Sequence, residues 1–130
     1  MSGMSPRNDG SQNIHFLRKA TTAADQGSVI TVGVVPAGSL ILKPLSGIHI
    51  TTAYTAGTNH QYDIGTSDND DLFGTNLDVS TATFVPLDEA VGDYYVTANT
   101  TITATPDLTG TSATVGAGII VIAYVPNNDR

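Results

Sequence analysis

The sequence contains no cysteine and no tryptophan, and its basic residues are few. Without cysteine, no disulfide can staple the fold, and no thiolate is present as a nucleophile or as a soft metal ligand. No apolar run approaches the roughly 20 residues that a membrane-spanning helix needs. The first twenty residues also lack the apolar core of a secretion signal. We therefore expect synthesis in the cytoplasm and no association with a membrane.

The charge of the chain is low in density and uneven in distribution. Charged residues make up 13% of the chain, against roughly 25% in typical globular domains. Threonine occurs 19 times, so hydroxyls fill many of the polar positions. Residues 1–26 carry three basic and two acidic groups (+1), and residues 27–130 carry two basic and ten acidic groups (−8), which together give −7. An acidic body repels phosphate backbones, so we expect no nucleic acid partner.

Short runs of β-branched and aliphatic residues, separated by Pro and Gly, fill the chain from residue 28 onward. Such runs predict strands, which we place at residues 28–35, 39–43, 46–54, 60–64, 72–79, 82–86, 93–98, 100–105 and 115–125. The last run is the most apolar and predicts a central strand that ends before Pro126. Residues 86–92 are compatible with a single helical turn. The pattern predicts an all-β fold: an antiparallel two-sheet sandwich of the jelly-roll type.

Three segments are expected from this pattern: an N-terminal arm (1–26), a β-sandwich domain (27–126) and a short polar tail (127–130). Within the arm, Ile14 and Phe16 alternate as in a strand, whereas Ile14, Leu17 and Arg18 also suit one helical turn. The arm is either a disordered tail or a segment that becomes ordered against a neighbouring subunit. In the second case its contact residues are Arg7, Ile14, Phe16, Leu17, Arg18 and Lys19.

The acidic segment 63–71 is the best candidate for a metal site. Asp68, Asp70 and Asp71, with Asn69 between them, place oxygen ligands of the kind that Ca²⁺ prefers on one turn. The spacing lacks the central Gly and the distal Glu of an EF-hand loop. Asp and Asn also populate tight turns for backbone reasons alone, so the pattern favours a solvated turn. We expect no cofactor.

Catalytic motifs are missing from the sequence. It has no GxSxG elbow, no phosphate-binding Gly loop and no HExxH helix. The neighbouring carboxylates Asp88 and Glu89 would point to opposite faces of an extended segment. A hairpin centred on residues 56–58 would bring His49 opposite His60. This pattern favours a structural role for the two histidines over a metal site. The glycines at 116 and 118 predict close backbone packing. We expect no enzyme activity.

The order of these segments resembles a known group of proteins. Residues 18–74 (RKATTAADQGSVITVGVVPAGSLILKPLSGIHITTAYTAGTNHQYDIGTSDNDDLFG) contain a polar lead, a first strand, a PAG turn, a strand reaching TTAY, and IGT before an acidic turn. Residues 97–126 (TANTTITATPDLTGTSATVGAGIIVIAYVP) end in a Gly-rich apolar strand. Over residues 18–126 the chain resembles the jelly-roll capsid decoration, or cement, proteins of tailed bacteriophages.

That resemblance implies a structural virion protein made in the cytoplasm of a bacterial host. It implies a homotrimer on the outer surface of a capsid, with the major capsid protein as partner and stabilisation of contacts between capsid subunits as its role. The resemblance transfers no functional residue. The alternative is a carbohydrate- or receptor-binding module of a head fibre or tail tip. In that case Tyr94 and Tyr95, adjacent on a strand, would direct one ring outward.

Overall fold

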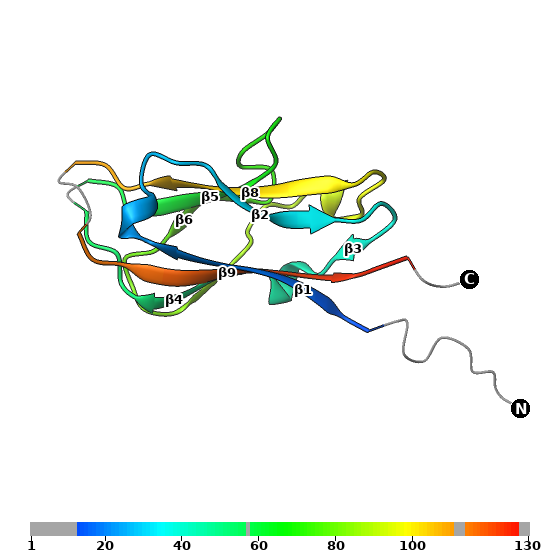
Figure 1. Ribbon diagram of the computed structural model, residues 1–130, viewed down its shortest axis with the longest axis horizontal. Coiled ribbons are helices and arrows are strands. Elements are labelled where there is room, and N and C mark those ends of the chain that lie inside the picture. The colour runs from blue at the N-terminus through cyan, green and yellow to red at the C-terminus, as the bar shows by residue number, and fades with distance from the viewer. Residues whose placement is uncertain (1–12, 57, 111–113, 128–130) are drawn as a thin grey trace, which may run out of the picture.

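The computed structural model describes residues 13–56, 58–110 and 114–127, which fold into two antiparallel sheets packed face to face (Figure 1). Sheet A has the strand order β1-β9-β4-β7, with β3 also paired to β9, and sheet B has the order β2-β8-β5-β6. The strands of sheet A are β1 (His15–Thr22), β3 (Leu40–Ile41), β4 (Gly47–Thr52), β7 (Phe84–Pro86) and β9 (Ala117–Val125). Those of sheet B are β2 (Ile30–Val35), β5 (Gln61–Gly65), β6 (Gly74–Asp78) and β8 (Thr100–Asp107).

The pairing of these strands is that of a jelly roll. β1 pairs with β9, β2 with β8, β4 with β7 and β5 with β6, so the first half of the chain pairs in reverse order with the second half. The pairs β4–β9 and β5–β8 then join this long antiparallel ribbon to itself within the two sheets. The all-β, jelly-roll-type sandwich expected from the sequence is therefore confirmed.

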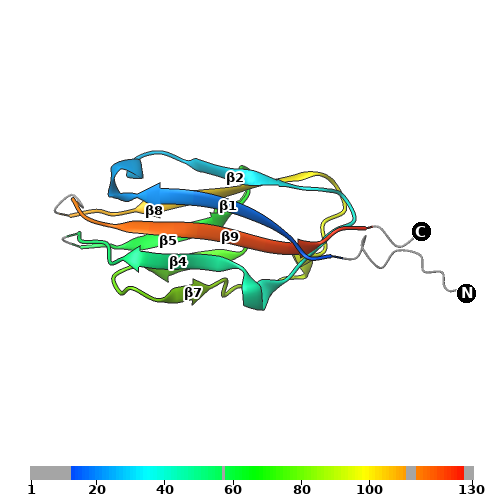
Figure 2. The ribbon, with the colours of Figure 1, turned by 60° about the horizontal axis from the view of Figure 1, so that its bottom comes forward.

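The core lies between the sheets and is filled by alternate residues of each strand. Ile120 and Ile122 of β9 and Ile48 of β4 face Ile102 of β8 and Ile64 of β5, and all five are fully buried. β9 lies between β1 and β4 (Figure 2), which confirms the central strand that its apolar sequence predicts. It ends at Val125, directly before Pro126. The predicted close packing at Gly116 is also found, because a Cβ there would overlap the ring of Tyr54.

Part of the predicted N-terminal arm belongs to the sandwich. Residues 15–22 form a strand that pairs with β9 along its whole length, from His15 opposite Tyr124 to Thr22 opposite Ala117. The sandwich therefore begins by His15, and the boundary placed at residue 26 is wrong. The strand alternative for this segment is correct, and the helical turn is not found. β9 offers it an unpaired edge and an apolar inner face, which an isolated segment lacks.

A buried hydroxyl network fastens the end of β1 to the core. Thr21 Oγ1 donates to Asp25 Oδ2 at 2.8 Å and lies 2.8 Å from the hydroxyl of Tyr62 on β5. The Tyr54 hydroxyl donates to the Thr21 carbonyl at 3.2 Å, and the Tyr62 hydroxyl lies 3.3 Å from that of Tyr54. Burial raises the pKa of both tyrosines, so the network stays neutral in charge at Tyr54 and Tyr62. It links the edge of sheet A to sheet B.

Three short 3-10 helices complete the described fold: η1 (Ala23–Asp25), η2 (Lys43–Leu45) and η3 (Gly92–Tyr94). The predicted strand at 93–98 is wrong: η3 begins at Gly92, and only Tyr95 makes an isolated bridge, to Leu40. The predicted helical turn at 86–92 is wrong as well, because Pro86 pairs with Gly47 as the last residue of β7. Among the described residues, no helix is long and apolar enough to cross a membrane.

Candidate functional site

The surface of sheet A that points away from the core is largely apolar. We call it the outer face of sheet A, and the strand registers assign it these residues: Phe16, Arg18, Ala20, Thr22, Leu40, Gly47, His49, Thr52, Phe84, Pro86, Ala117, Ile119, Val121, Ala123 and Val125. One row across the sheet runs Ala20, Ile119, His49, Phe84, because each is the direct partner of the next. Neighbours on this face therefore come from four strands that are distant in sequence.

Large apolar side chains on this face are open to solvent. Phe16 on the edge strand β1 is 55% exposed, Leu40 on β3 is 47% exposed, and Phe84 on the opposite edge strand β7 is 37% exposed. Tyr95 bridges Leu40 and is exposed beside it. A sheet face that meets only water normally carries polar side chains. This face has the composition of a surface that contacts another macromolecule.

The charges of the described residues are divided between the two sheets. The five strands of sheet A contain no acidic residue, and β1 carries Arg18 and Lys19. The third described base, Lys43, lies in η2 between β3 and β4. The four strands of sheet B contain no basic residue and carry Asp63, Asp78 and Asp107. The protein therefore has a weakly basic, apolar face on one side and an acidic face on the other.

The outer face of sheet B is built from hydroxyls and carboxylates. Its residues by register are Thr31 and Val34 of β2, Thr101, Thr103, Thr105 and Asp107 of β8, Gln61 and Asp63 of β5, and Asp78 of β6. Burial raises the pKa of Asp63, and the nearby Asp70, Asp71 and Asp107 act in the same direction. Hydrogen bonds from Ser80 lower the pKa of Asp78, so the pKa values of the two carboxylates are shifted in opposite directions.

The candidate Ca²⁺ ligands Asp68, Asp70 and Asp71 lie in the loop between β5 and β6. The loop is closed by its backbone: the Thr66 amide donates to the Asn69 carbonyl at 2.9 Å, and the Asn69 amide donates to Thr66 Oγ1 at 3.2 Å. Across the described ranges, no three His, Cys, Asp or Glu side chains are close enough together to hold a metal ion. The loop is a turn held by hydrogen bonds of its own backbone and of Thr66.

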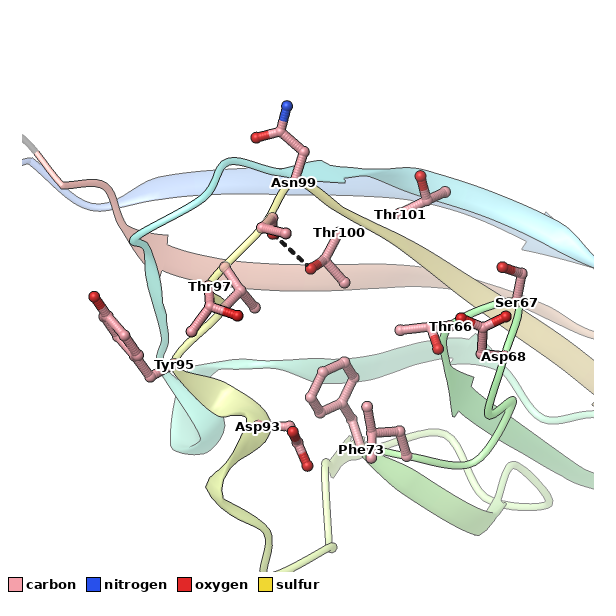
Figure 3. Close-up of a pocket in the computed structure, with 13 residues that line it drawn as sticks. Thr66, Ser67, Asp68, Phe73, Asp93, Tyr95, Thr97, Asn99, Thr100 and Thr101 are labelled. Carbon is pink, nitrogen blue, oxygen red and sulfur yellow. Dashed lines mark hydrogen bonds between the residues drawn. The ribbon is translucent and has the colours of Figure 1, made fainter.

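A polar groove runs between this loop and the segment that enters β8 (Figure 3). Its volume is about 390 Å³. Thr66, Ser67 and Asp68 form one wall, residues 95–101 form the other, and the buried Phe73 lies at the bottom. The ring of Tyr95 points away from the groove. The groove thus offers hydroxyl and carboxylate groups without an exposed aromatic platform.

Neighbouring carboxylates at residues 88 and 89 have a structural role. Asp88 Oδ1 accepts the amide of Thr75 at 3.0 Å, and the Thr75 hydroxyl donates to Glu89. The two side chains therefore meet on one residue, and the prediction that they point to opposite faces is wrong. The Tyr94 hydroxyl donates to the Glu89 carbonyl at 2.8 Å, and burial raises its pKa to about 12. Tyr94 packs on Phe73 and Tyr95 is exposed, although the two residues do not lie on a strand as the sequence predicts.

The predicted pairing of His49 with His60 is wrong. β4 and β5 belong to different sheets, so no hairpin joins them. His49 lies on the outer face of sheet A opposite Phe84 and Ile119, and His60 Nδ1 lies 3.8 Å from Asp78 Oδ1.

Most candidate arm residues are part of the sandwich. Phe16 and Arg18 lie on the outer face of sheet A, and Leu17 packs against the core. Lys19 is exposed on the same strand, and Ile14 precedes it and is also exposed. Arg7 lies outside the described residues.

Sequence reasoning missed Leu40, Phe84 and the outward side of β9 as parts of one surface. Their segments are far apart in the chain, and the sheet brings them together. One signal was available: the segments 15–22, 47–52, 84–86 and 117–125 contain no Asp or Glu in a chain that has 12.

Comparison with known proteins gives a structural likeness. No protein-family model matches the chain, and no curated protein matches it significantly. A chain of a solved structure described as the cyanophage Pam1 capsid asymmetric unit is similar in fold, with a TM-score of 0.65 and 12% sequence identity. The similarity covers 97% of this chain and 94% of that chain. The two proteins therefore share the sandwich fold over nearly their whole lengths.

Proposed function

We propose that this chain is a structural virion protein that binds the outer surface of a phage capsid as a homotrimer and stabilises contacts between capsid subunits. Its partner is the major capsid protein, its location is the virion, and it catalyses no reaction. The observation that carries the proposal is the likeness in fold to a chain of a phage capsid asymmetric unit. The sequence resemblance to decoration proteins points the same way.

The extent of that likeness supports a role as a separate shell component. Because 97% of this chain aligns with 94% of the other, the two chains are about equal in length. A chain of this size in a capsid is one sandwich and little else. The outer face of sheet A supplies the exposed apolar surface that such a protein needs to bind neighbours.

The proposal is tested by adding the purified protein to phage capsids that lack it. We expect it to sediment with the particles, to saturate at hundreds of copies per shell, and to raise the temperature at which the shell breaks open. Light scattering of the free protein measures the predicted trimer. If the protein does not bind shells, or if purified virions contain a handful of copies, the capsid-surface role is wrong.

A second candidate function is carbohydrate or receptor binding, and the groove in Figure 3 favours it. Hydroxyls of Thr66 and Ser67 and the carboxylates of Asp68 and Asp93 can bond to the hydroxyls of a sugar. A glycan array tests it, with Asp68→Ala as the groove variant and Asp78→Ala as a control outside the groove. Binding that Asp68→Ala abolishes and Asp78→Ala retains would establish this function.

A further inference from the structure

The outer face of sheet A differs from an ordinary solvated sheet face in its central strand. β9 presents Ile119 and Val121 outward between the exposed Phe16 at one edge of the sheet and Phe84 at the other. Alternation of apolar and polar residues is expected of a strand with one face in water. β9 lacks it, and its outward residues are apolar as well. The chain itself buries Ala123 but leaves Ile119 and Val121 partly exposed, so these two outward residues indicate a partner.

Charge shows what kind of partner fits. The protein has a net charge of −7, yet the outer face of sheet A carries Arg18 and His49 and no carboxylate. The outer face of sheet B and the β5–β6 loop carry Asp63, Asp78 and Asp107 and residues 68–71. An acidic protein surface would be repelled by sheet B and accepted by sheet A. The charge pattern therefore sets the orientation of docking as well as its location.

A second copy of the chain fits this face poorly. In a two-fold pair through sheet A, each Arg18 would meet a surface that has basic groups and no carboxylate of its own. In a head-to-tail contact, sheet A of one copy would cover sheet B of the next, and opposite faces of a sandwich give an open stack in place of a closed ring. Neither arrangement gives the closed oligomer of the proposed function.

We propose that the outer face of sheet A docks on the capsid protein, on a patch with an apolar centre and with carboxylates facing Arg18. Sheet B and the acidic loop then point away from the shell. This inference rests on the proposed function, which leaves open the face that meets the capsid. The contact would combine apolar burial by Phe16, Leu40 and Phe84 with charge pairing at the rim.

The test uses two variants that add the same charge to opposite faces. Phe16→Asp and Val34→Asp each replace an exposed apolar residue on an edge strand, one in sheet A and one in sheet B; the two side chains are 55% and 48% exposed. Binding to capsids that lack the protein is measured over a range of protein concentrations. We expect Phe16→Asp to weaken binding by about tenfold or more, and Val34→Asp by less than about twofold. Thermal unfolding confirms that both variants fold.

Arg18→Gln tests the charge pairing separately. It keeps most of the side-chain stem and removes the positive charge. We expect binding to weaken by about threefold to tenfold at low salt, and the difference from wild type to shrink as salt is added. Equal loss at low and high salt would rule out a carboxylate opposite Arg18.

The outcomes separate this inference from the proposed function. If the wild-type protein does not bind capsids, the proposed function itself is wrong. If it binds and Val34→Asp weakens binding as much as Phe16→Asp, or neither variant does, the docking face is wrong and the proposed function stands. If Phe16→Asp disrupts the oligomer of the free protein, as measured by light scattering, a second copy covers sheet A and the inference is overturned.

Discussion

The outer faces of the two sheets differ although their inner faces are built alike. Both inner faces carry alternating Ile, Val and Tyr side chains, such as Ile120 on β9 and Ile102 on β8. The outer face of sheet B continues the alternation with threonine and aspartate, whereas the outer face of sheet A continues with Phe16, Ile119 and Phe84. The two sheets therefore have similar inner faces, which form the core, and chemically different outer faces.

This difference separates what folding requires from what it leaves free. The inner faces are fixed by the need to fill one core at high density. An outward side chain contributes less to folding, so its identity reports on other demands such as solubility or binding. Sheet B carries threonines and carboxylates in place of apolar groups, although Thr103 is buried and Asp63 is partly buried. Sheet A has exposed apolar groups and no carboxylates, which is why we place the contact surface there.

The most severe way to disturb sheet A alone is Gly47→Ala. A Cβ at Gly47 would overlap the carbonyl oxygen of Val85, a backbone atom that cannot move without displacing β7. We expect a loss of about 3 kcal/mol or more in the free energy of unfolding, measured by denaturant titration. Gly92→Ala is the control, because a Cβ there meets nothing within 4 Å. Similar stability of the two variants would show that β7 is not held tightly against β4.

Much of the fold could be predicted because local pattern and tertiary structure agree. The run 115–125 is apolar at both its inward and its outward positions, and its residues Ala117–Val125 form the central strand β9. Pro126 ends it because Pro has no amide to donate. In the segment 93–98, local pattern and tertiary structure disagree. Tyr95 and Val96 have strand propensity, but the structure has η3 followed by a single bridge from Tyr95 to Leu40, and no strand forms. A segment with high strand propensity does not form a strand where no neighbouring strand is available to pair with it.

The candidate site could not be predicted, because it depends on register between distant segments. His49 lies beside Phe84 and Ile119 through pairings of β4 with β7 and β9. Periodicity tells which residues share a face of one strand, but not which strands become neighbours. The same limit explains the assignment of Phe16 and Arg18 to a free arm. Their partners lie more than a hundred residues further along the chain, in β9.

Tyr62→Phe tests the link between the two sheets. The variant removes the hydroxyl that contacts Thr21 Oγ1 and the Tyr54 hydroxyl, and the buried network loses both of these contacts. We expect a loss of about 1–2 kcal/mol in the free energy of unfolding, together with faster hydrogen exchange in β1. Tyr95→Phe is the control, since Tyr95 is exposed. Unchanged exchange in β1 would mean that pairing with β9 alone holds the strand.

Asp63→Asn tests the electrostatics of sheet B. Burial raises the pKa of Asp63, so its ionised form is less favourable in the folded state than in the unfolded state. This penalty is complete above the raised pKa and disappears as the pH falls below the usual pKa of an aspartate. We therefore expect Asp63→Asn to be more stable than wild type at pH 7, by a few tenths to about 1 kcal/mol, and equal to it near pH 3.

Asp78→Asn is the matched control on the same face and should change stability in the opposite direction. Hydrogen bonds from Ser80 lower the pKa of Asp78, so its carboxylate stabilises the folded state above the usual pKa, and this contribution is lost as the pH falls through the lowered value. Denaturant titrations at both pH values measure the two effects. If both variants shifted stability in one direction, net charge would outweigh the local environments of the two groups.

The smallest effect is expected where the structure places a contact residue with no role in folding. Arg18 is exposed, and the ion pair found among the described residues does not involve it. We expect Arg18→Gln to change the free energy of unfolding by less than about 0.5 kcal/mol, as is usual for surface positions. A loss above about 1 kcal/mol would show that the fold itself holds the guanidinium, and its presence on sheet A would then need no partner. If the free energy of unfolding is unchanged, folding does not explain why this acidic protein has Arg18 on its apolar face, and binding does.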